Sequence, residues 1–172
     1  QFGEVNVVLD CGLHPHVAGV DALPDFDRLH ALTGGHITAL FVTHAHRDHA
    51  GAVGEFQKRH ASTPIYATRA TCALMGAPGA QDDVLATADT SALEPTDTHT
   101  WFSLADGLEA ALTPAGHVVG AAAVSLRGPD ATPVLYCPDV AVAAHRTVGP
   151  FEAPEGFKPA VVVVGAAGGD RV

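Results

Sequence analysis

Four side chains that can bind a metal stand within six consecutive residues, directly after an apolar run of strand length. The run is Ile37 to Val42, and the block after Thr43 reads His44-Ala45-His46-Arg47-Asp48-His49. Side chains two apart in an extended segment point the same way, so the first two histidines can converge on one metal ion, while the aspartate and the third histidine turn toward a neighbouring one. Since a solvated histidine-rich loop rarely has this spacing, the block predicts a metal site at the carboxyl end of a strand.

Two further candidate ligands follow later strands. His117 comes after the segment 113–116, and Asp139 comes after Tyr136-Cys137-Pro138. A carboxylate can bridge two metal ions, so Asp139 is a candidate for a shared position. Mixed nitrogen and oxygen donors suit a borderline cation such as zinc, and the lack of cysteine in the block argues against a purely structural zinc site. The alternatives are a capped core histidine at 117 and a turn carboxylate at 139.

The composition limits the class of protein. The 172 residues are 47% apolar, enough for one domain with a real core, and the formal net charge is −10. Nonspecific nucleic-acid binding depends on Lys and Arg, so this negative net charge argues against a broad phosphate-binding surface. It does not exclude a local phosphate-binding site. Cys11, Cys72 and Cys137 are few, odd in number and far apart, which suits a reducing compartment. No stretch approaches the ~20 apolar residues of a membrane span, and no leader opens the chain, so we expect a soluble cytoplasmic protein without a membrane partner.

Strand and helix signals alternate along the chain without a long polar linker or an internal repeat. Strands are expected at residues 5–10, 37–42, 64–67, 108–113, 121–126, 134–136 and 160–164. Helices are expected from Pro24 to Leu32, from Ala50 to His60 and through residues 71–75, and residues 76–98 are expected to be loop with at most one helical turn. This mixture predicts one layered α/β or α+β domain.

These motifs resemble those of the metallo-β-lactamase fold. The features that match are the HxHxDH block, the Gly-His pair at 116–117, Asp139 after its strand, and Leu9-Asp10-Cys11-Gly12 at the end of the first strand. The segments 9–15, 21–24 and 115–122 further resemble the β-CASP branch of that family. That branch includes the endonuclease subunit of the cleavage and polyadenylation specificity factor and prokaryotic ribonucleases. The resemblance covers nearly the whole chain.

The resemblance implies an α+β fold of the αββα metallo-β-lactamase type, with mixed sheets flanked by helices, over residues 1–172. It also implies a pair of zinc ions. The ligand set that it implies is His44, His46 and His117 for one ion, Asp48 and His49 for the other, and Asp139 between them. Such a pair lowers the pKa of a bridging water and clamps the oxygens of a phosphodiester during in-line attack, with Asp48 or Asp139 orienting the hydroxide. Asp10 would orient a ligand or a loop, unless it is a plain turn residue.

Two positions depart from the family pattern. Cys137-Pro138 stand where Thr-Gly usually precedes the aspartate, and a proline removes a backbone donor beside the metal site. Gly165 stands where the β-CASP branch has an acidic residue. The inserted cap domain and the later histidines of that branch, one of them a zinc ligand, are missing, so the second metal site is short of one ligand. Because the chain also opens at Gln1 without a methionine, we expect it to be the first part of a longer protein.

Three functions remain open from the sequence. The first is a metal-dependent hydrolase whose intact parent cuts RNA phosphodiesters, with RNA as its partner. The second is a hydrolase of a small thioester, lactone or lactam, which the acidic balance favours. The third is a degenerate scaffold domain, suggested by Gly165 and Cys137-Pro138. The sequence leaves the oligomeric state open. The histidines interpreted as surface or packing residues are His14, His16, His30, His36, His60, His99 and His145.

Overall fold

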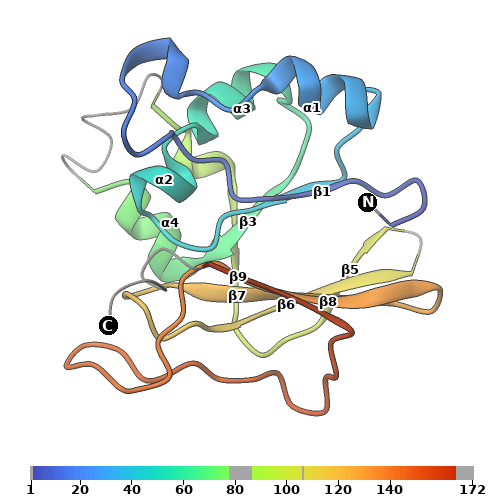
Figure 1. Ribbon diagram of the computed structural model, residues 1–172, viewed down its shortest axis with the longest axis vertical. Coiled ribbons are helices and arrows are strands. Elements are labelled where there is room, and N and C mark those ends of the chain that lie inside the picture. Colours follow the sequence, from blue (N-terminus) through green and yellow to red (C-terminus); the bar gives the residue numbers. More distant parts are fainter. Residues whose placement is uncertain (1, 78–86, 106, 166–172) are drawn as a thin grey trace.

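The computed structural model describes residues 2–77, 87–105 and 107–165, and its strands form two sheets stacked face to face (Figure 1). The first sheet is parallel throughout and has the strand order β1-β2-β3-β4. Its strands are β1 Val7–Leu9, β2 Ala39–Phe41, β3 Ile65–Thr68 and β4 Leu93–Thr96. All three residues of β2 are buried, as expected for a central parallel strand that is covered on both faces.

The second sheet has the order β5-β6-β7-β8-β9 and is antiparallel except for the parallel pair of β8 and β9. Its strands are β5 Phe102–Ala105, β6 Leu108–Pro114, β7 Ala122–Gly128, β8 Ala131–Cys137 and β9 Val161–Val164. The order places β9 at an edge of the sheet, and all four of its valines are exposed.

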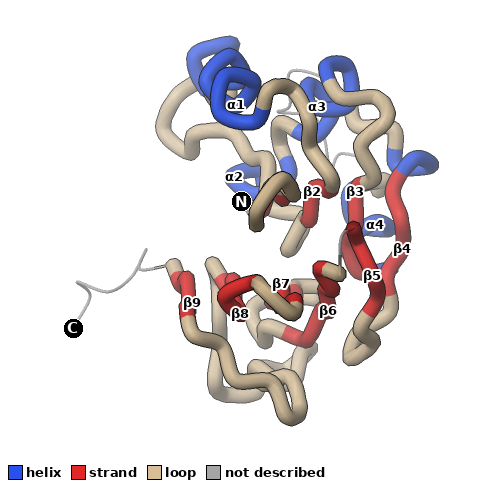
Figure 2. Tube along the Cα trace, turned by 90° about the vertical axis from the view of Figure 1, so that its right-hand side faces the viewer, coloured by secondary structure: helices blue, strands red, loops and turns tan. Residues whose placement is uncertain are grey.

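Helices cover the outer face of the first sheet (Figures 1 and 2). They are α1 Phe26–Thr33, α2 Arg47–Ala50, α3 Val53–Arg59 and α4 Arg69–Met75, with the 3-10 turns η1 Gly19–Ala22 and η2 Thr90–Ala92. The Asp25 carboxylate accepts a hydrogen bond from the Arg28 backbone N–H and so begins α1. Gly34, in a left-handed conformation, ends it. None of the helices in the described ranges has the length and apolar character needed to cross a membrane.

Successive residues of β2 point to opposite faces of the first sheet, so they belong to two different layers of the core. Leu40 of β2 packs among the helix side chains Phe26 and Phe56, whereas Phe41 faces the second sheet and packs with Leu112 and Val124. The ring of Phe41 stacks on that of Tyr66 of β3 at a centroid distance of 5.2 Å. Both faces of the first sheet are therefore covered, one by helices and the other by the second sheet.

A loop covers the outer face of the second sheet. Phe151 and Phe157 pack there against Ala123, Leu135 and Cys137. The αββα pattern implies a second layer of helices, but among the residues that the structure describes this face carries no helix: the segment 138–160 covers it, together with Trp101, whose ring centroid lies 5.3 Å from that of Phe157. Prolines at positions 138, 150, 154 and 159 remove backbone donors along this segment and disfavour a helix.

Three predicted elements differ from the structure. The single helix expected from Ala50 to His60 is wrong, because α2 begins earlier and the chain bends before α3, where the Ala52 backbone N–H donates to the Cys11 carbonyl at 2.9 Å. The loop expected at residues 76–98 contains η2 and β4, while residues 78–86 lie outside the described ranges. The strand β5 was not predicted.

Candidate metal centre

The predicted ligands follow four strand ends that meet at one end of the two-sheet sandwich. β2 leads to the block at 44–49, β6 leads to His117, and β8 leads to Asp139. The fourth strand, β1, leads to Asp10, which the structure also brings to this end. Within the block, His46 is extended and α2 begins directly after it, so the last two predicted ligands of the block lie on the first turn of a helix.

Gly12 allows the segment after β1 to approach the block. The Cys11 backbone N–H donates to the His49 carbonyl at 2.8 Å, and the Leu13 backbone N–H donates to the Arg47 carbonyl at 3.0 Å. A Cβ atom on Gly12 would collide with the carbonyl oxygen of Asp48, so a side chain at this position would push the two segments apart. The glycine thereby fixes where the helical half of the block lies.

Four of the predicted ligands form a compact donor set, whose ligand atoms all lie within 4.8 Å of one another: His44, His46, His117 and Asp139. His44 Nε2 lies 3.1 Å from His46 Nδ1 and 3.3 Å from Asp139 Oδ2. His117 Nε2 lies 3.4 Å from the same His46 nitrogen and 3.6 Å from the same Asp139 oxygen. Four of the six distances within the set therefore fall between 3.1 and 3.6 Å.

These separations fit a tetrahedral metal ion. Four donors placed about 2.0–2.1 Å from a zinc ion at the corners of a tetrahedron lie about 3.3–3.4 Å from one another. Three imidazole nitrogens and one carboxylate oxygen are also a donor mixture that borderline divalent cations accept. The first donor set could hold a metal ion without rearrangement.

A second donor set shares the Asp139 oxygen. His49 Nε2 lies 3.4 Å from Asp139 Oδ2 and 3.6 Å from Asp48 Oδ2. The Asp48 side chain is 48% exposed, so this set opens toward solvent. Three protein donors leave a fourth position for a solvent molecule or a substrate atom, which is the pattern of catalytic metal sites.

Two histidines of the cluster have opposite electrostatic environments. Burial of the His44 imidazole lowers its pKa to about 3, and the nearby histidines at 49 and 46 add to the effect. Burial also lowers the pKa of His49, but the hydrogen bond to Asp10 and the charges of Asp10, Asp48 and Asp139 outweigh it, so the pKa of His49 is raised. His44 is therefore a neutral imidazole with a lone pair available to a metal ion.

The two departures from the family pattern lie against each other. The Gly165 backbone N–H donates to the Pro138 carbonyl at 2.8 Å, and a Cβ atom on Gly165 would collide with that same oxygen. An acidic side chain at 165 is therefore incompatible with the present path of residues 137–139. The structure explains Gly165 as a partner of Pro138, and residues 166–172 lie outside the described ranges.

Asp10 is the centre of a hydrogen-bond network that the sequence predicted only in part. Its Oδ2 lies 2.7 Å from His49 Nδ1. The side chains of Thr43 and Tyr136 also donate to Asp10, at 2.9 Å each, and neither was predicted to take part in the site. Thr43 could have been found from its place directly before the block, whereas Tyr136 carries no sequence signal because it lies 126 positions from Asp10.

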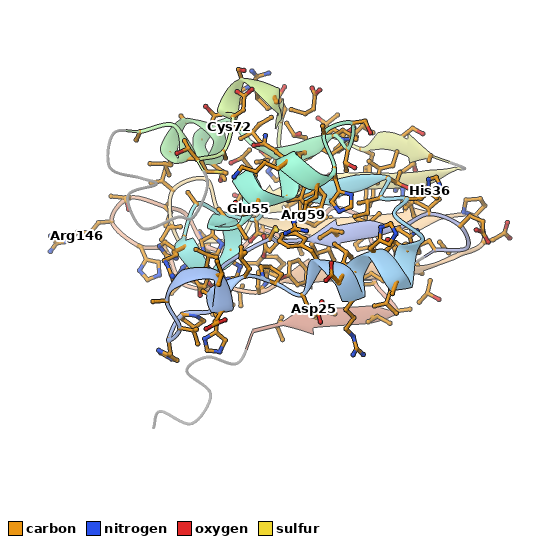
Figure 3. All side chains as sticks on the ribbon, turned by 90° about the horizontal axis from the view of Figure 1, so that it is seen from above. Asp25, His36, Glu55, Arg59, Cys72 and Arg146 are labelled. Atoms are coloured by element: carbon orange, nitrogen blue, oxygen red, sulfur yellow. The ribbon has the colours of Figure 1, made fainter. Side chains whose placement is uncertain are left out.

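The seven remaining histidines stay outside both donor sets, as predicted. Six of them are exposed, and the ring of His60 lies against Phe56 at a centroid distance of 4.8 Å. His36 lies at the far end of the molecule from the loop that carries Arg146 (Figure 3). His14 is the nearest of them to the block along the fold, since its carbonyl accepts a hydrogen bond from the Arg47 guanidinium at 3.0 Å.

Two stacked sheets with helices over one face, and a cluster of histidines and aspartates at the strand ends, define a domain of the metallo-hydrolase class. The chain belongs to the Metallo-beta-lactamase superfamily, whose sequence profile matches residues 2–164. The fold class implied by the HxHxDH block and its accompanying motifs is confirmed.

Sequence relatives support the predicted branch of the superfamily. The chain is 29% identical over 188 residues to the Drosophila melanogaster cleavage and polyadenylation specificity factor 73, an alignment that covers 100% of this chain and 26% of that protein. It is 40% identical over 85 residues to ribonuclease J of Corynebacterium glutamicum, covering 45% of this chain and 11% of the relative. The predicted resemblance to β-CASP proteins is confirmed by these matches. The chain spans about a quarter of the length of the first of these relatives.

Solved structures show the same fold at low sequence identity. A metallo-β-lactamase of Cronobacter sakazakii, described as a HARLDQ-motif mutant, superposes with a TM-score of 0.67 at 18% identity, covering 95% of this chain and 69% of that one. The Rm3 metallo-β-lactamase superposes with a TM-score of 0.60 at 17% identity, covering 92% and 57%. These similarities concern the fold alone.

Proposed function

We propose that the protein carrying this chain is a cytoplasmic, zinc-dependent ribonuclease, and that residues 1–172 supply most of its metal site. The observation that carries the proposal is the position of Asp139 Oδ2, which lies 3.3 Å from His44 Nε2 and 3.4 Å from His49 Nε2. One carboxylate oxygen between two donor sets suits a pair of metal ions. The names of the relatives, a cleavage and polyadenylation specificity factor and a ribonuclease, support RNA as the substrate.

The proposed ligands keep the two sets described above. The first zinc ion would be held by His44, His46 and His117, the second by Asp48 and His49, and Asp139 would contact both. When bound, the ions supply Lewis-acid stabilisation of the charge that develops on a phosphodiester and lower the pKa of a coordinated water. The Asp48 carboxylate, which is half exposed, would orient the attacking oxygen and accept its proton.

Metal content tests the site directly. Purified chain, dialysed against zinc and then against zinc-free buffer, should retain zinc, and His46→Ala should lose most of the ion held by the first set. His36→Ala is the matched control, because His36 is exposed and lies at the other end of the molecule. A chain that retains no zinc, or a His46→Ala variant that retains as much as the control, would contradict the proposed site.

Cleavage tests the substrate. The full-length protein, incubated with single-stranded RNA, should produce fragments, and a chelator should stop the reaction until zinc is restored. Asp48→Asn should reduce the rate by about 10²-fold or more, since it removes a proton acceptor while keeping the shape of the side chain. RNA cleavage that persists in the chelator would contradict a metal-dependent mechanism.

Because the net charge is negative, a small-molecule hydrolase is the second candidate function. The net charge of −10 gives little attraction for a polyanion, and the cation within the block, Arg47, donates to the carbonyls of His14 and Val17. A panel of thioesters, lactones and β-lactams distinguishes the two functions. Turnover of one of these substrates without RNA cleavage would favour the second candidate, and zinc binding without any turnover would favour a scaffold domain.

A further inference from the structure

The carboxylate of Asp10 receives four hydrogen bonds from three residues, one from a backbone N–H and three from side chains. Its Oδ1 accepts from the Thr43 backbone N–H at 2.7 Å, and its Oδ2 accepts from the Thr43 hydroxyl at 2.9 Å. The same Oδ2 lies 2.7 Å from His49 Nδ1 and accepts from the Tyr136 hydroxyl at 2.9 Å. The Asp10 side chain is only 8% exposed, so protein donors take the place of water around it.

The hydrogen bonds to this carboxylate determine which nitrogen of His49 carries a proton. An ionised carboxylate can only accept hydrogen bonds, so every partner of Asp10 must donate. His49 therefore carries a proton on Nδ1, and in the neutral ring its Nε2, beside Asp139 and Asp48, has the lone pair.

The same reasoning determines the tautomer of His44 through the Thr43 hydroxyl. The Thr43 hydroxyl has a single proton, and it is used in the bond to Asp10. The hydroxyl oxygen also lies 3.1 Å from His44 Nδ1, so in that contact it must be the acceptor and His44 Nδ1 must be the donor. His44 Nε2 is then left with a lone pair, at 3.3 Å from Asp139 Oδ2.

We propose that Thr43 is a positioning residue that relays the charge of Asp10 to His44, and that one carboxylate thereby sets the tautomer of a histidine in each donor set. Tyr136 is the fourth donor, which holds Asp10 Oδ2 between the sheets. It comes from β8, three positions before Asp139 on the same strand end, so it also links the first strand to the bridging carboxylate. Thr43 and Tyr136 touch no substrate, and they act by presenting the two Nε2 atoms.

The inference rests on the proposed function for the identity of the metal, but the tautomers exist without one. Long-range ¹H–¹⁵N correlation spectra of the metal-free chain at about pH 8, above the ordinary pKa of imidazole, distinguish Nδ1–H from Nε2–H. Both His44 and His49 should be Nδ1–H in the unmodified chain. A His44 that is Nε2–H would overturn the relay without any variant having to fold, whereas failure of the chain to bind zinc would contradict only the proposed function.

Variants test the relay itself. Thr43→Val removes the hydroxyl and keeps the shape, so His44 should become a mixture of tautomers while His49 stays Nδ1–H, and zinc affinity should fall about 10- to 100-fold. Thr43→Ser should restore both properties. Thr113→Val is the matched control, because the Thr113 hydroxyl is equally buried but has no hydrogen-bond partner among the described residues. Equal His44 spectra and equal zinc affinity in Thr43→Val and Thr113→Val would overturn the proposal.

Tyr136→Phe tests the fourth donor. Asp10 would keep its bonds to Thr43 and His49, so both tautomers should remain, but zinc affinity should fall by roughly tenfold because the carboxylate is less firmly held. Tyr66→Phe is a suitable control, since the Tyr66 ring lies in the same inter-sheet core. Unchanged zinc affinity in Tyr136→Phe would remove Tyr136 from the network.

Discussion

Asp139 Oδ2 faces His44 Nε2 at 3.3 Å and His49 Nε2 at 3.4 Å, so a single oxygen atom belongs to both donor sets. Replacing His117 would remove a donor from the first set only, whereas replacing Asp139 would remove one from each. The two sets therefore share one atom, although His44 and His46 lie in the first half of the block, His49 lies in the second half and His117 follows β6.

Gly12 offers a test of how the block is held. In Gly12→Ala the new Cβ meets the Asp48 carbonyl, so the segments must separate, and we expect a loss of about 3 kcal/mol in the free energy of unfolding. Gly149→Ala is the control, because nothing lies within 4 Å of a Cβ at that position, and its effect should stay within about 0.5 kcal/mol. Urea unfolding of both variants measures the difference, and similar midpoints would show that the close approach is not needed.

His44 predicts how the stability of the metal-free chain depends on pH. Its pKa is lowered from 6.5 to about 3 in the folded state, so between these values the unfolded state binds one proton more and stability falls as the pH falls. The expected slope is about 1.4 kcal/mol per pH unit. His49 has a raised pKa, so the stability that it contributes is fully present well below its ordinary pKa and decreases as the pH rises, which opposes the His44 slope near pH 6.5. His60, whose pKa is lowered by burial, acts in the same direction as His44.

Unfolding measured between about pH 6.5 and 5, above the range in which most carboxylates titrate, isolates this effect. His44→Gln should flatten the slope, and His36→Gln, which changes an exposed histidine, should leave it as it is. Identical slopes in the two variants would contradict the assignment to His44.

Secondary-structure elements show what the sequence can predict here. β2, β6 and β7 are apolar runs with buried residues, and each was predicted because burial alone defines it. β4 was missed because it reads Leu93-Glu94-Pro95-Thr96 and has a single buried residue. Such a strand exists only through its pairing with β3, and its proline is tolerated because β4 lies at an edge.

Some parts of the candidate site could be predicted from the local sequence, and others depend on tertiary packing. The block at 44–49 could be recognised from its local spacing. His117 and Asp139 were candidate ligands because they follow later strands, but only the resemblance to a known family implied that they approach the block. The bond between Tyr136 and Asp10 depends on how the two sheets stack, and no local pattern encodes it. The bend before α3 was missed because Gly51 and Ala52 carry no strong helix-breaking signal.

The first turn of α1 gives a prediction about one element. Asp25 accepts the Arg28 backbone N–H at 2.8 Å, so Asp25→Ala should lower the free energy of unfolding by about 1 kcal/mol. Asp27→Ala is the control, since Asp27 lies in the same turn and its side chain is exposed. Thermal unfolding by circular dichroism compares them. Equal losses would indicate that the negative charge near the helix start matters more than the capping bond.

The whole domain should respond to the metal ion. Zinc bound only to the folded state at about 100 times its Kd adds about 2.7 kcal/mol, which corresponds to a rise in Tm of about 5–10 °C for a chain of this size. Magnesium should have little effect, because it prefers oxygen donors and the first set has three imidazoles. His117→Ala should reduce the rise with zinc, whereas His145→Ala should not. Calorimetry with and without a chelator measures this rise in Tm, and an unchanged Tm would contradict zinc binding to the folded state.

The exposed edge strand β9 affects how the protein self-associates in solution. The four valines of β9 are 43–55% exposed, and no strand within the described ranges pairs with the outer edge of β9, so this edge can template pairing with another copy. The net charge of −10 opposes such contact through mutual repulsion, which salt screens over about 10 Å at 0.1 M. Light scattering should therefore report growing self-association as salt is added, and Val162→Lys should suppress it. Colloidal stability, rather than folding, then limits the ionic strength at which the chain stays dispersed.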